Sequence, residues 1–433
     1  MNKFYITTTI PYVNSKAHLG HAREFIFADV IARYQKSLGK EIFLNTGTDE
    51  HGLKVYRKAT EEGRDPKEYV DEFAEQFKQL MPLLGILPEH NFIRTTDEHH
   101  IAASQEFWKL CDKNGDIYKK NYKIKYCVGC ELEKTGSEIV DGKCPIHPNL
   151  ELEIIDEENY FFRFSKYQEP LLKYYETHPN FVVPDFRFNE IIQFTKEGLQ
   201  DFSISRLKAK MPWGVPVPND NNHVMYVWFD ALVNYISSLG WPASAEATAG
   251  KPEESYFSQF WGIKEKPNAL QVAGKDNLRQ QSAMWQAMLM SAGLPNSKQI
   301  IILGFINSGG QKMSKSLGNV ADPIEILAKL KSNGLSDSQA TDALRYYLIG
   351  EIPVFEDGDY AWEKFEENYN ASLANGLGNL FERVFTMILT NPDKIDLTTS
   401  EVVNIDKNVK EWVTETELNY KNEMENYRLL EAS

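Results

Sequence analysis

The chain of 433 residues is poor in cysteine, with four in all, and lacks any apolar run of about 18 residues, the length that a transmembrane helix needs. Its first residues, MNKFYITTTIPY, lack the charged, apolar and cleavage regions of a signal peptide. So few cysteines do not indicate the disulfide framework of a small secreted protein. We therefore expect a cytoplasmic protein that does not act at a membrane.

The chain has fewer basic than acidic residues: 47 lysines and arginines stand against 62 aspartates and glutamates, which gives a formal net charge of −15. This balance argues against a generally basic surface of the kind that coats nucleic acid, although it leaves room for a local basic patch. The hydrophobic content of 42% is ordinary for a globular protein, and the length suggests roughly two to four domains.

Two histidines lie where a helix is expected to begin. His18 and His21 bracket Leu19-Gly20, after a strand-like run (3–9) and before an amphipathic helical pattern that ends at Gly39. A helix N-terminus binds anions through its free N–H groups and its dipole, and imidazoles there can donate hydrogen bonds to phosphate oxygens. The pattern predicts a nucleotide-phosphate site, with solvated or capping histidines as the alternative.

Ligand-type residues follow several short apolar runs. In an open parallel sheet, ligands bind beyond the carboxyl ends of the strands. This recurrence predicts an α/β fold with a doubly wound, Rossmann-like parallel sheet. The runs are 42–44, followed by Asp49 and His51; 270–273, followed by Gly274 and Asp276; and 300–303, followed by GFINSGGQKMSKSLGN.

Three cysteines and a histidine have the spacing of a zinc knuckle. Cys127, Cys130, Cys144 and His147 follow the pattern C-x2-C-x13-C-x2-H, which can direct four ligands at one tetrahedral ion. A disulfide is the rival interpretation, and a reducing cytosol disfavours it. Since the chain itself fills all four positions, we expect one structural Zn²⁺ per chain. The remaining cysteine, Cys111, is expected in the core.

More than two hundred residues separate the run 42–44 from the run 270–273, which indicates a domain inserted into the catalytic sheet. Within this insertion, lysines alternate with tyrosines in a pattern that fits either a solvated face or contact with RNA. These residues are Lys119, Lys120, Lys123 and Lys125, with Tyr118, Tyr122 and Tyr126.

The loop Lys312-Met313-Ser314-Lys315-Ser316 places two lysines among glycines and serines, which suits mobile charges that close over phosphates. Together with His18-Leu19-Gly20-His21, it resembles the two signatures of the class I aminoacyl-tRNA synthetases. From Lys3 to roughly Leu380 the chain resembles the methionyl-tRNA synthetases that have one zinc in the connective domain. The motifs that carry this resemblance are TTTIPYVNSKAHLGHA, GTDEHG, the zinc knuckle, VMYVWFDALVNY, GKD and KMSKSLGN.

The resemblance implies ATP-dependent adenylation of L-methionine, then transfer to the 3′ end of tRNA(Met), with Mg²⁺ accompanying ATP. The methionine carboxylate is already a nucleophile, so the reaction needs alignment and charge stabilisation and no activated serine or cysteine. The implied catalytic residues are His18, His21, Lys312 and Lys315, and the implied ATP-binding residues are His18, Gly20, His21, Gly274, Asp276 and Lys315. The implied methionine pocket comprises Ile10, Tyr12, Asp49, Trp228, Ala231, Leu232, Tyr235, Gln281 and Trp285, with Asp49 holding the α-ammonium group.

The resemblance also implies an incomplete anticodon-binding domain, with helices near 365–387 and 406–431. We therefore expect the chain to form methionyl-adenylate but to charge tRNA poorly. The expected division is a split catalytic domain (1–115 and 223–310), an inserted connective domain (116–222) with the knuckle at 126–148, a KMSKS-loop and stem-contact region (311–362), and a helical C-terminal region (363–433).

The chain departs from the family pattern before Trp285, where Gln280 and Gln281 stand in place of an aromatic residue and a histidine. Gln271 likewise stands where a histidine is common, so the amino-acid selectivity stays open. The alternatives are a class I synthetase for another amino acid, a catalytically impaired tRNA-binding paralogue, and a nucleotidyltransferase of the cytidylyl or pantetheine type. The last of these would lack the zinc-bearing insertion. The oligomeric state does not follow from the sequence.

Overall fold

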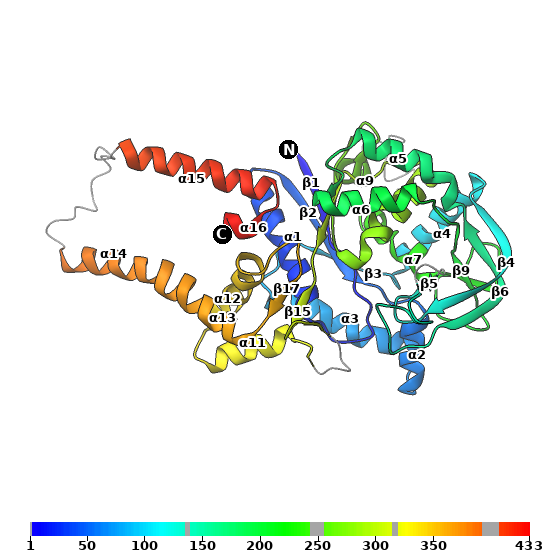
Figure 1. Ribbon diagram of the computed structural model, residues 1–433, viewed down its shortest axis with the longest axis horizontal. Helices are drawn as coiled ribbons and strands as arrows, with labels where there is room; N and C mark the ends of the chain where they lie inside the picture. The colour runs from blue at the N-terminus through cyan, green and yellow to red at the C-terminus, as the bar shows by residue number, and fades with distance from the viewer. Residues whose placement is uncertain (1, 135–138, 243–254, 314–318, 392–406) are drawn as a thin grey trace. The chain divides into compact units, whose positions relative to one another are not determined.

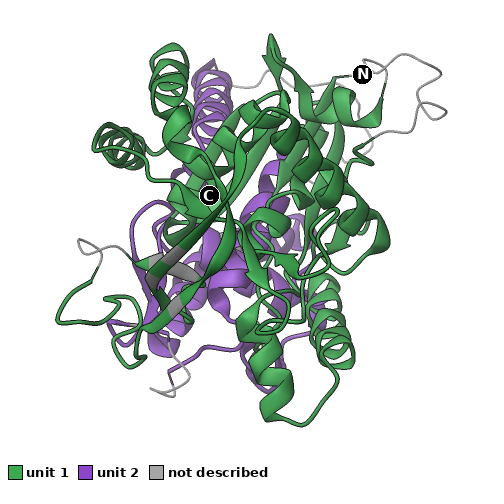
Figure 2. Ribbon diagram, turned by 90° about the vertical axis from the view of Figure 1, so that its right-hand side faces the viewer, with its two compact units in different colours: residues 1–17, 35–82, 86–303 green, residues 18–34, 83–85, 304–433 purple. Residues whose placement is uncertain are grey.

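The computed structural model describes residues 2–134, 139–242, 255–313, 319–391 and 407–433. The chain forms two compact units, which Figure 2 shows in green and purple. Unit 1 comprises residues 1–17, 35–82 and 86–303, and unit 2 comprises residues 18–34, 83–85 and 304–433. The four-part domain division expected from the sequence stays a prediction.

Unit 1 is built on a six-stranded sheet in which every neighbouring pair of strands is parallel. The strand order is β3-β2-β1-β13-β14-β7, so the order reverses between β1 and β13 and creates a switch point there. This confirms the expected α/β fold with a parallel sheet. The strands are β1 (Lys3–Thr7), β2 (Glu41–Thr48), β3 (Asn91–Arg94), β7 (Val182–Val183), β13 (Ala269–Gly274) and β14 (Gln299–Leu303).

The central strands are apolar because helices cover both faces of a parallel sheet, which leaves little solvent-facing surface. In β14, Ile300, Ile301 and Ile302 are all fully buried, and in β1 Tyr5 and Ile6 are as well. The three predicted apolar runs therefore form strands of one sheet, as expected. The helices of unit 1 are α2 (Leu53–Glu61), α3 (Pro66–Leu83), α4 (Glu98–Lys113), α5 (Gln168–Thr177), α6 (Asp185–Lys196), α7 (Val227–Ala231), α8 (Asn234–Ser237), α9 (Tyr256–Trp261) and α10 (Trp285–Ala292).

A second, antiparallel sheet of four strands follows α4, in the order β5-β4-β6-β8, and Figure 1 shows β4 and β6 running side by side. Lys119 pairs with Asp220 at 2.9 Å, and Lys123 pairs with Asp156 at 3.5 Å. These ion pairs favour a solvated face for the lysine run. The strands are β4 (Ile117–Cys127), β5 (Leu132–Lys134), β6 (Glu153–Phe162) and β8 (Phe202–Ser203), and short hairpins add β9 (Ser205–Leu207), β10 (His223–Met225), β11 (Gly262–Ile263) and β12 (Lys266–Pro267).

Unit 2 is mainly helical. Its centre is the long helix α1 (Leu19–Ser37), whose buried Asp29 accepts hydrogen bonds from Arg33 at 2.7 Å and from Arg345 at 2.6 Å. The other elements are α11 (Pro323–Ser332), α12 (Asp337–Gly350), α13 (Trp362–Asn368), α14 (Asn379–Thr390), α15 (Lys407–Glu425), α16 (Leu429–Ala432) and the small sheet of β15 (Ile306–Ser308), β16 (Gln311–Lys312) and β17 (Gly358–Tyr360).

Helices are present near 365–387 and 406–431, as expected, but each stretch is interrupted. A π-helical segment (Tyr369–Gly378) separates α13 from α14, and the positive φ of 60° at Tyr427 ends the last long helix before α16 begins. Within the described ranges, no helix has both the length and the apolar content that crossing a bilayer requires.

Candidate active site

The predicted phosphate-binding histidines stack on each other at the start of α1, with ring centroids 3.8 Å apart and an interplanar angle of 18°. The backbone N–H of Gly20 donates to Nδ1 of His18 at 3.0 Å, and the backbone N–H of His18 donates to Nδ1 of His21 at 3.4 Å. Because each Nδ1 accepts, the proton of each neutral ring lies on Nε2. The turn therefore presents two imidazole donors beside a helix N-terminus, where anions are favoured.

Burial, together with the neighbouring His18, holds the pKa of His21 well below its usual value. His21 is therefore neutral at physiological pH and acts as a hydrogen-bond donor without net charge. Net positive charge at such a site has to come from other groups, such as the lysines of the 312–316 loop.

Gly20 is required by the geometry of this turn. A Cβ atom at position 20 would lie 2.8 Å from Cε1 and 2.9 Å from Nδ1 of His18, which is closer than van der Waals contact allows. Any side chain at position 20 would displace the His18 ring.

The segment that follows the lysine loop contacts the histidine turn within unit 2, because the backbone N–H of Leu19 donates to the carbonyl of Ala321 at 3.0 Å. Lys312 ends β16, and its side chain is not described. Lys315 lies outside the described residues, so its predicted role stays a prediction.

The predicted methionine-pocket residues lie in unit 1, and several of them contact one another. Tyr12 and Trp228 meet edge to face at 6.2 Å, and Tyr235 meets Trp285 in the same way at 5.9 Å. Ala231 ends α7, and Leu232 follows it directly; both are buried, while Ile10 is half-buried in the loop after β1.

Several buried polar atoms of this group have no hydrogen-bond partner in the part of the chain that is described. Buried polar groups are nearly always paired, so a cluster of unpaired ones is typical of a ligand site. The atoms are the Tyr12 hydroxyl, Asp49 Oδ1, Trp228 Nε1, Trp285 Nε1 and Gln280 Oε1.

Asp49 follows β2 directly, and its side chain is only 2% exposed. Its backbone N–H donates to the carbonyl of Pro11 at 2.9 Å, and its carbonyl accepts from the backbone N–H of Val13 at 3.2 Å. These bonds hold the segment after β2 against the segment after β1. Burial, with the carboxylates of Asp230 and Glu131 nearby, raises the pKa of Asp49 well above its usual value. A buried carboxylate of this kind is complementary to a cationic ligand group such as an ammonium.

Sequence reasoning missed the network behind this carboxylate. Asp230, on α7, accepts hydrogen bonds from His51 Nδ1 at 2.6 Å, His100 Nε2 at 2.8 Å and Ser104 Oγ at 3.2 Å. Although burial alone would raise it, the two histidines hold the pKa of Asp230 well below its usual value. The network ties the segment after β2 to α7, the helix that carries Trp228. Asp230 and His100 are 130 residues apart, so the sequence singled out His51 after its apolar run but did not indicate that the three residues meet.

Two of the glutamines that depart from the family pattern, Gln271 and Gln281, belong to a buried chain of hydrogen bonds. Gln281 Nε2 donates to the Tyr235 hydroxyl at 2.6 Å, and Gln271 Nε2 donates to Gln281 Oε1 at 3.2 Å. Ser297 Oγ donates in turn to Gln271 Oε1. Gln281 lies in a π-helical segment (Gln280–Met284), a distortion frequently found at functional sites. The amides therefore fix the orientation of the Tyr235 ring.

Gly274 and Asp276 lie at the end of β13, beside the switch point of the sheet. Asp276 is exposed, and its Oδ1 accepts a weak hydrogen bond from Asn277 Nδ2 at 3.4 Å. This is the edge at which open α/β sheets bind ligands.

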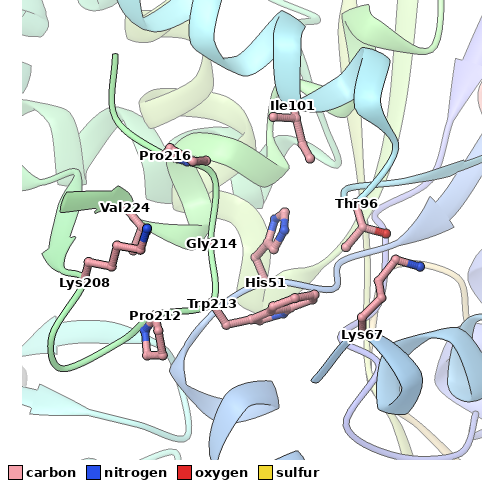
Figure 3. A pocket seen from close by; sticks show the side chains of 10 residues that line it. All are labelled: His51, Lys67, Thr96, Ile101, Lys208, Pro212, Trp213, Gly214, Pro216 and Val224. Carbon is pink, nitrogen blue, oxygen red and sulfur yellow. The ribbon is translucent and has the colours of Figure 1, made fainter. Parts of the chain in front are cut away.

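A cavity of about 320 Å³ adjoins the segment after β2. Figure 3 shows the rings of His51 and Trp213 side by side on its wall; they meet edge to face at 5.6 Å, and Trp213 Nε1 donates to the Glu50 carbonyl at 2.6 Å. The other lining residues are Lys67, Thr96, Ile101, Lys208, Pro212, Gly214, Pro216 and Val224.

The four predicted metal ligands come together, with their ligand atoms all within 4.8 Å of one another. Cys130 Sγ lies 3.5 Å from Cys144 Sγ and 3.2 Å from His147 Nδ1, and Cys127 Sγ lies 3.8 Å from the same nitrogen. In a tetrahedral site with Zn–S bonds of about 2.3 Å, sulfurs are about 3.8 Å apart. All four cysteines are free, so the rival disulfide is not formed. The cluster can therefore hold one metal ion.

Comparison with known proteins gives consistent matches. A family model described as tRNA synthetases class I (M) matches residues 4–153 and 137–385. The methionine–tRNA ligase of Thermotoga maritima is 44% identical over 433 aligned residues, which cover 99% of this chain and 65% of the relative. That of Nostoc sp. is 44% identical over 386 residues, or 89% of this chain and 69% of the relative. The chain thus spans about two thirds of the length of these curated relatives.

A solved structure is also similar. Mycobacterium tuberculosis methionyl-tRNA synthetase in complex with methionyl-adenylate superimposes with a TM-score of 0.88 at 35% identity, covering 100% of this chain and 81% of that one.

Proposed function

Since the chain belongs to the methionine-type class I tRNA synthetases, we propose that it adenylates L-methionine with ATP and transfers the methionyl group to the 3′ end of tRNA(Met). The observation that carries this proposal is the buried Asp49 carboxylate with its unpaired Oδ1, within a group of aromatic side chains whose polar atoms are also unpaired among the described residues. Family membership argues against the nucleotidyltransferase alternative. We also propose that the chain acts in the cytoplasm.

In the proposed first step, the methionine carboxylate attacks the α-phosphorus of ATP. A new C–O–P bond forms, the bond from the α-phosphorus to the bridging oxygen breaks, and pyrophosphate leaves with the electron pair. His18 and His21 would donate hydrogen bonds from Nε2 to the phosphate oxygens, and Lys312 and Lys315 would supply positive charge. Mg²⁺ bound with ATP would neutralise further charge on the phosphates.

Methionine itself would be held at both ends. Asp49 would pair with the α-ammonium group, and Tyr12, Trp228, Tyr235 and Trp285 would surround the thioether, which makes favourable contacts with aromatic rings. The backbone of Ile10 and the side chains of Ala231, Leu232 and Gln281 would complete the pocket. On the ATP side, Asp276 would bind the ribose and Gly274 would let the nucleotide approach the backbone.

We further propose that the metal cluster holds one Zn²⁺ in a structural role. The donor set of three thiolates and one imidazole suits zinc, and all four positions are protein ligands, which leaves none for a substrate.

The test is ATP–pyrophosphate exchange with the purified chain, measured in turn with each of the twenty amino acids. Methionine should stimulate exchange far more than leucine or any other amino acid. Stronger stimulation by a different amino acid would identify a synthetase of other specificity, and tRNA binding without any exchange would identify an impaired paralogue.

A further inference from the structure

One knuckle residue is buried away from the metal cluster. Glu131 directly follows the ligand Cys130, yet its side chain is only 1% exposed and its backbone has a positive φ of 52°. A left-handed conformation is unfavourable for a glutamate, and a buried carboxylate is costly unless it is hydrogen-bonded. Both features persist only where the surroundings fix the residue.

The Glu131 carboxylate is fixed by two hydrogen bonds of different origin. Oε1 accepts the backbone N–H of Lys54 at 2.6 Å, and Oε2 accepts the hydroxyl of Tyr126, which precedes the knuckle ligands on β4. Lys54 is in the first turn of α2, whose own N-cap residue, Gly52, provides no side-chain cap. Glu131 therefore caps α2 from a segment 77 residues away, with a negative charge at the helix N-terminus.

The capped turn follows directly on the segment that carries Asp49 and His51. Gly52 has a φ of 103°, and a Cβ atom there would lie 3.3 Å from Glu131 Oε1 and 3.4 Å from the Val227 side chain. Gly52, in the segment after β2, thus lies against both the knuckle carboxylate and the start of α7. A shift of Glu131 would therefore remove one of the two contacts that hold this segment.

Apolar packing joins the same elements. A small cluster groups Tyr126 and Val128 of the knuckle region with Tyr12 and Trp228 of the proposed methionine pocket. The Arg206 guanidinium lies 5.1 Å from the Tyr126 ring centroid, over its face, and adds a cation–π contact to this packing.

From this juxtaposition we propose that Glu131 is a positioning residue through which the metal-bearing knuckle sets the shape of the methionine pocket. A bound metal ion would fix Cys130 and, with it, the neighbouring Glu131. Glu131 caps α2, and this cap holds the segment that carries Asp49. Methionine affinity should therefore depend on an intact knuckle, and linkage requires methionine to strengthen metal retention by the same factor. This inference rests on the proposed function, since it concerns the same amino-acid site.

The test compares Glu131→Ala with Glu153→Ala in the full chain. Glu153 is a matched control, because it is also a carboxylate of the inserted region that contacts α2, in a surface pair with Arg57 at 2.5 and 2.9 Å. In pyrophosphate exchange, Glu131→Ala should raise KM for methionine about tenfold and leave KM for ATP within about twofold. Glu153→Ala should change neither, and Glu131→Gln, which keeps an acceptor for the Lys54 N–H, should lie between.

A second readout does not use activity. Release of zinc to a colorimetric chelator should be slowed by methionine in the unmodified chain and in Glu153→Ala, but not in Glu131→Ala. In addition, Cys130→Ser should raise KM for methionine much less in the Glu131→Ala background than alone, because Glu131→Ala has already removed the hydrogen bond between the knuckle and α2.

An unchanged methionine KM in Glu131→Ala, or an equal rise in KM for ATP, would overturn the proposal. If Glu131→Ala does not fold, Glu131→Gln decides by the same two measurements. Failure of the proposed function would look different, since the unmodified chain would then show no methionine-dependent exchange.

Discussion

Asp49→Asn should move stability and methionine affinity in opposite directions. The substitution keeps the size of the side chain and an oxygen acceptor, but it removes the charge that would face the ammonium group. Hydrogen bonds to charged groups contribute about 1.5–3 kcal/mol, so KM for methionine should rise about 10- to 150-fold. The ATP KM should be unchanged, since Asp49 has no proposed contact with the nucleotide.

The stability effect follows from the raised pKa of Asp49, which burial and the neighbouring Asp230 and Glu131 cause. A folded-state pKa above the ordinary value of 3.8 means that the folded chain binds this proton more tightly than the unfolded chain. Folding stability therefore falls as the pH rises from about 3.8 through the folded-state pKa, by about 1.4 kcal/mol for each pH unit that separates the two pKa values. Without methionine, Asp49→Asn should melt at a higher temperature than the parent at pH 7, and this advantage should shrink as the pH falls toward 4.

Thermal melts from pH 5 to 8, with and without methionine, would be combined with exchange kinetics. The exposed Asp112→Asn is the control, and it should leave both quantities unchanged. A variant that is less stable than the parent at pH 7, or that keeps the parental methionine KM, would refute the assignment of Asp49 as a buried carboxylate that binds the ammonium group of methionine.

Three further changes test other parts of the site. Gly20→Ala should displace the His18 ring and slow exchange on the order of a hundredfold, the cost of one lost donor, with an unchanged circular dichroism spectrum; normal rates would contradict the histidine assignment. Gln281→Leu should leave the buried Gln271 Nε2 without its acceptor and remove the donor to the Tyr235 hydroxyl, lowering the free energy of unfolding by about 1–3 kcal/mol in urea titrations and raising KM for methionine; an unaffected variant would show that the amide chain does not orient the ring. Cys130→Ser should abolish the expected one zinc per chain in metal analysis and lower the melting temperature, whereas a fully folded metal-free parent would exclude a structural ion.

Much of the parallel sheet could be predicted because most of its strands contain a short apolar run. Runs such as Ile300–Ile302 are recognisable without knowledge of their partners, and the ligand-type residues after them follow from the rule for strand ends. The cluster of potential metal ligands could also be predicted, because Cys127 and Cys130 lie close in sequence to Cys144 and His147 and need only a short loop between them.

The remaining features depend on contacts distant in sequence. The two-residue strand β7 joins the edge of the parallel sheet from within the inserted region, and two valines carry no periodic signal. Glu131 has the sequence context of a surface residue in a charged knuckle until its partner 77 residues away is known. The break at Tyr427 could not be predicted either. Its backbone is left-handed, but the position has no glycine or proline that would indicate the end of a helix.

The buried polar groups of the proposed methionine pocket are of two kinds. Some are hydrogen-bonded to other side chains, and others have no partner among the described residues. Every link from Tyr235 through Gln281 and Gln271 to Ser297 is hydrogen-bonded, so methionine binding would not need to reorganise this chain of groups. The Tyr12 hydroxyl, by contrast, is buried without a partner among the described residues. Leaving such a group unpaired costs about 1–3 kcal/mol, a cost that a ligand or a bound water would offset. We therefore infer that selectivity rests on two different properties: the amide chain fixes the shape of the pocket, and the unpaired groups supply the attraction. The amide of Gln281 is hydrogen-bonded on both sides, so it can hold Tyr235 in place without a ring side chain at that position.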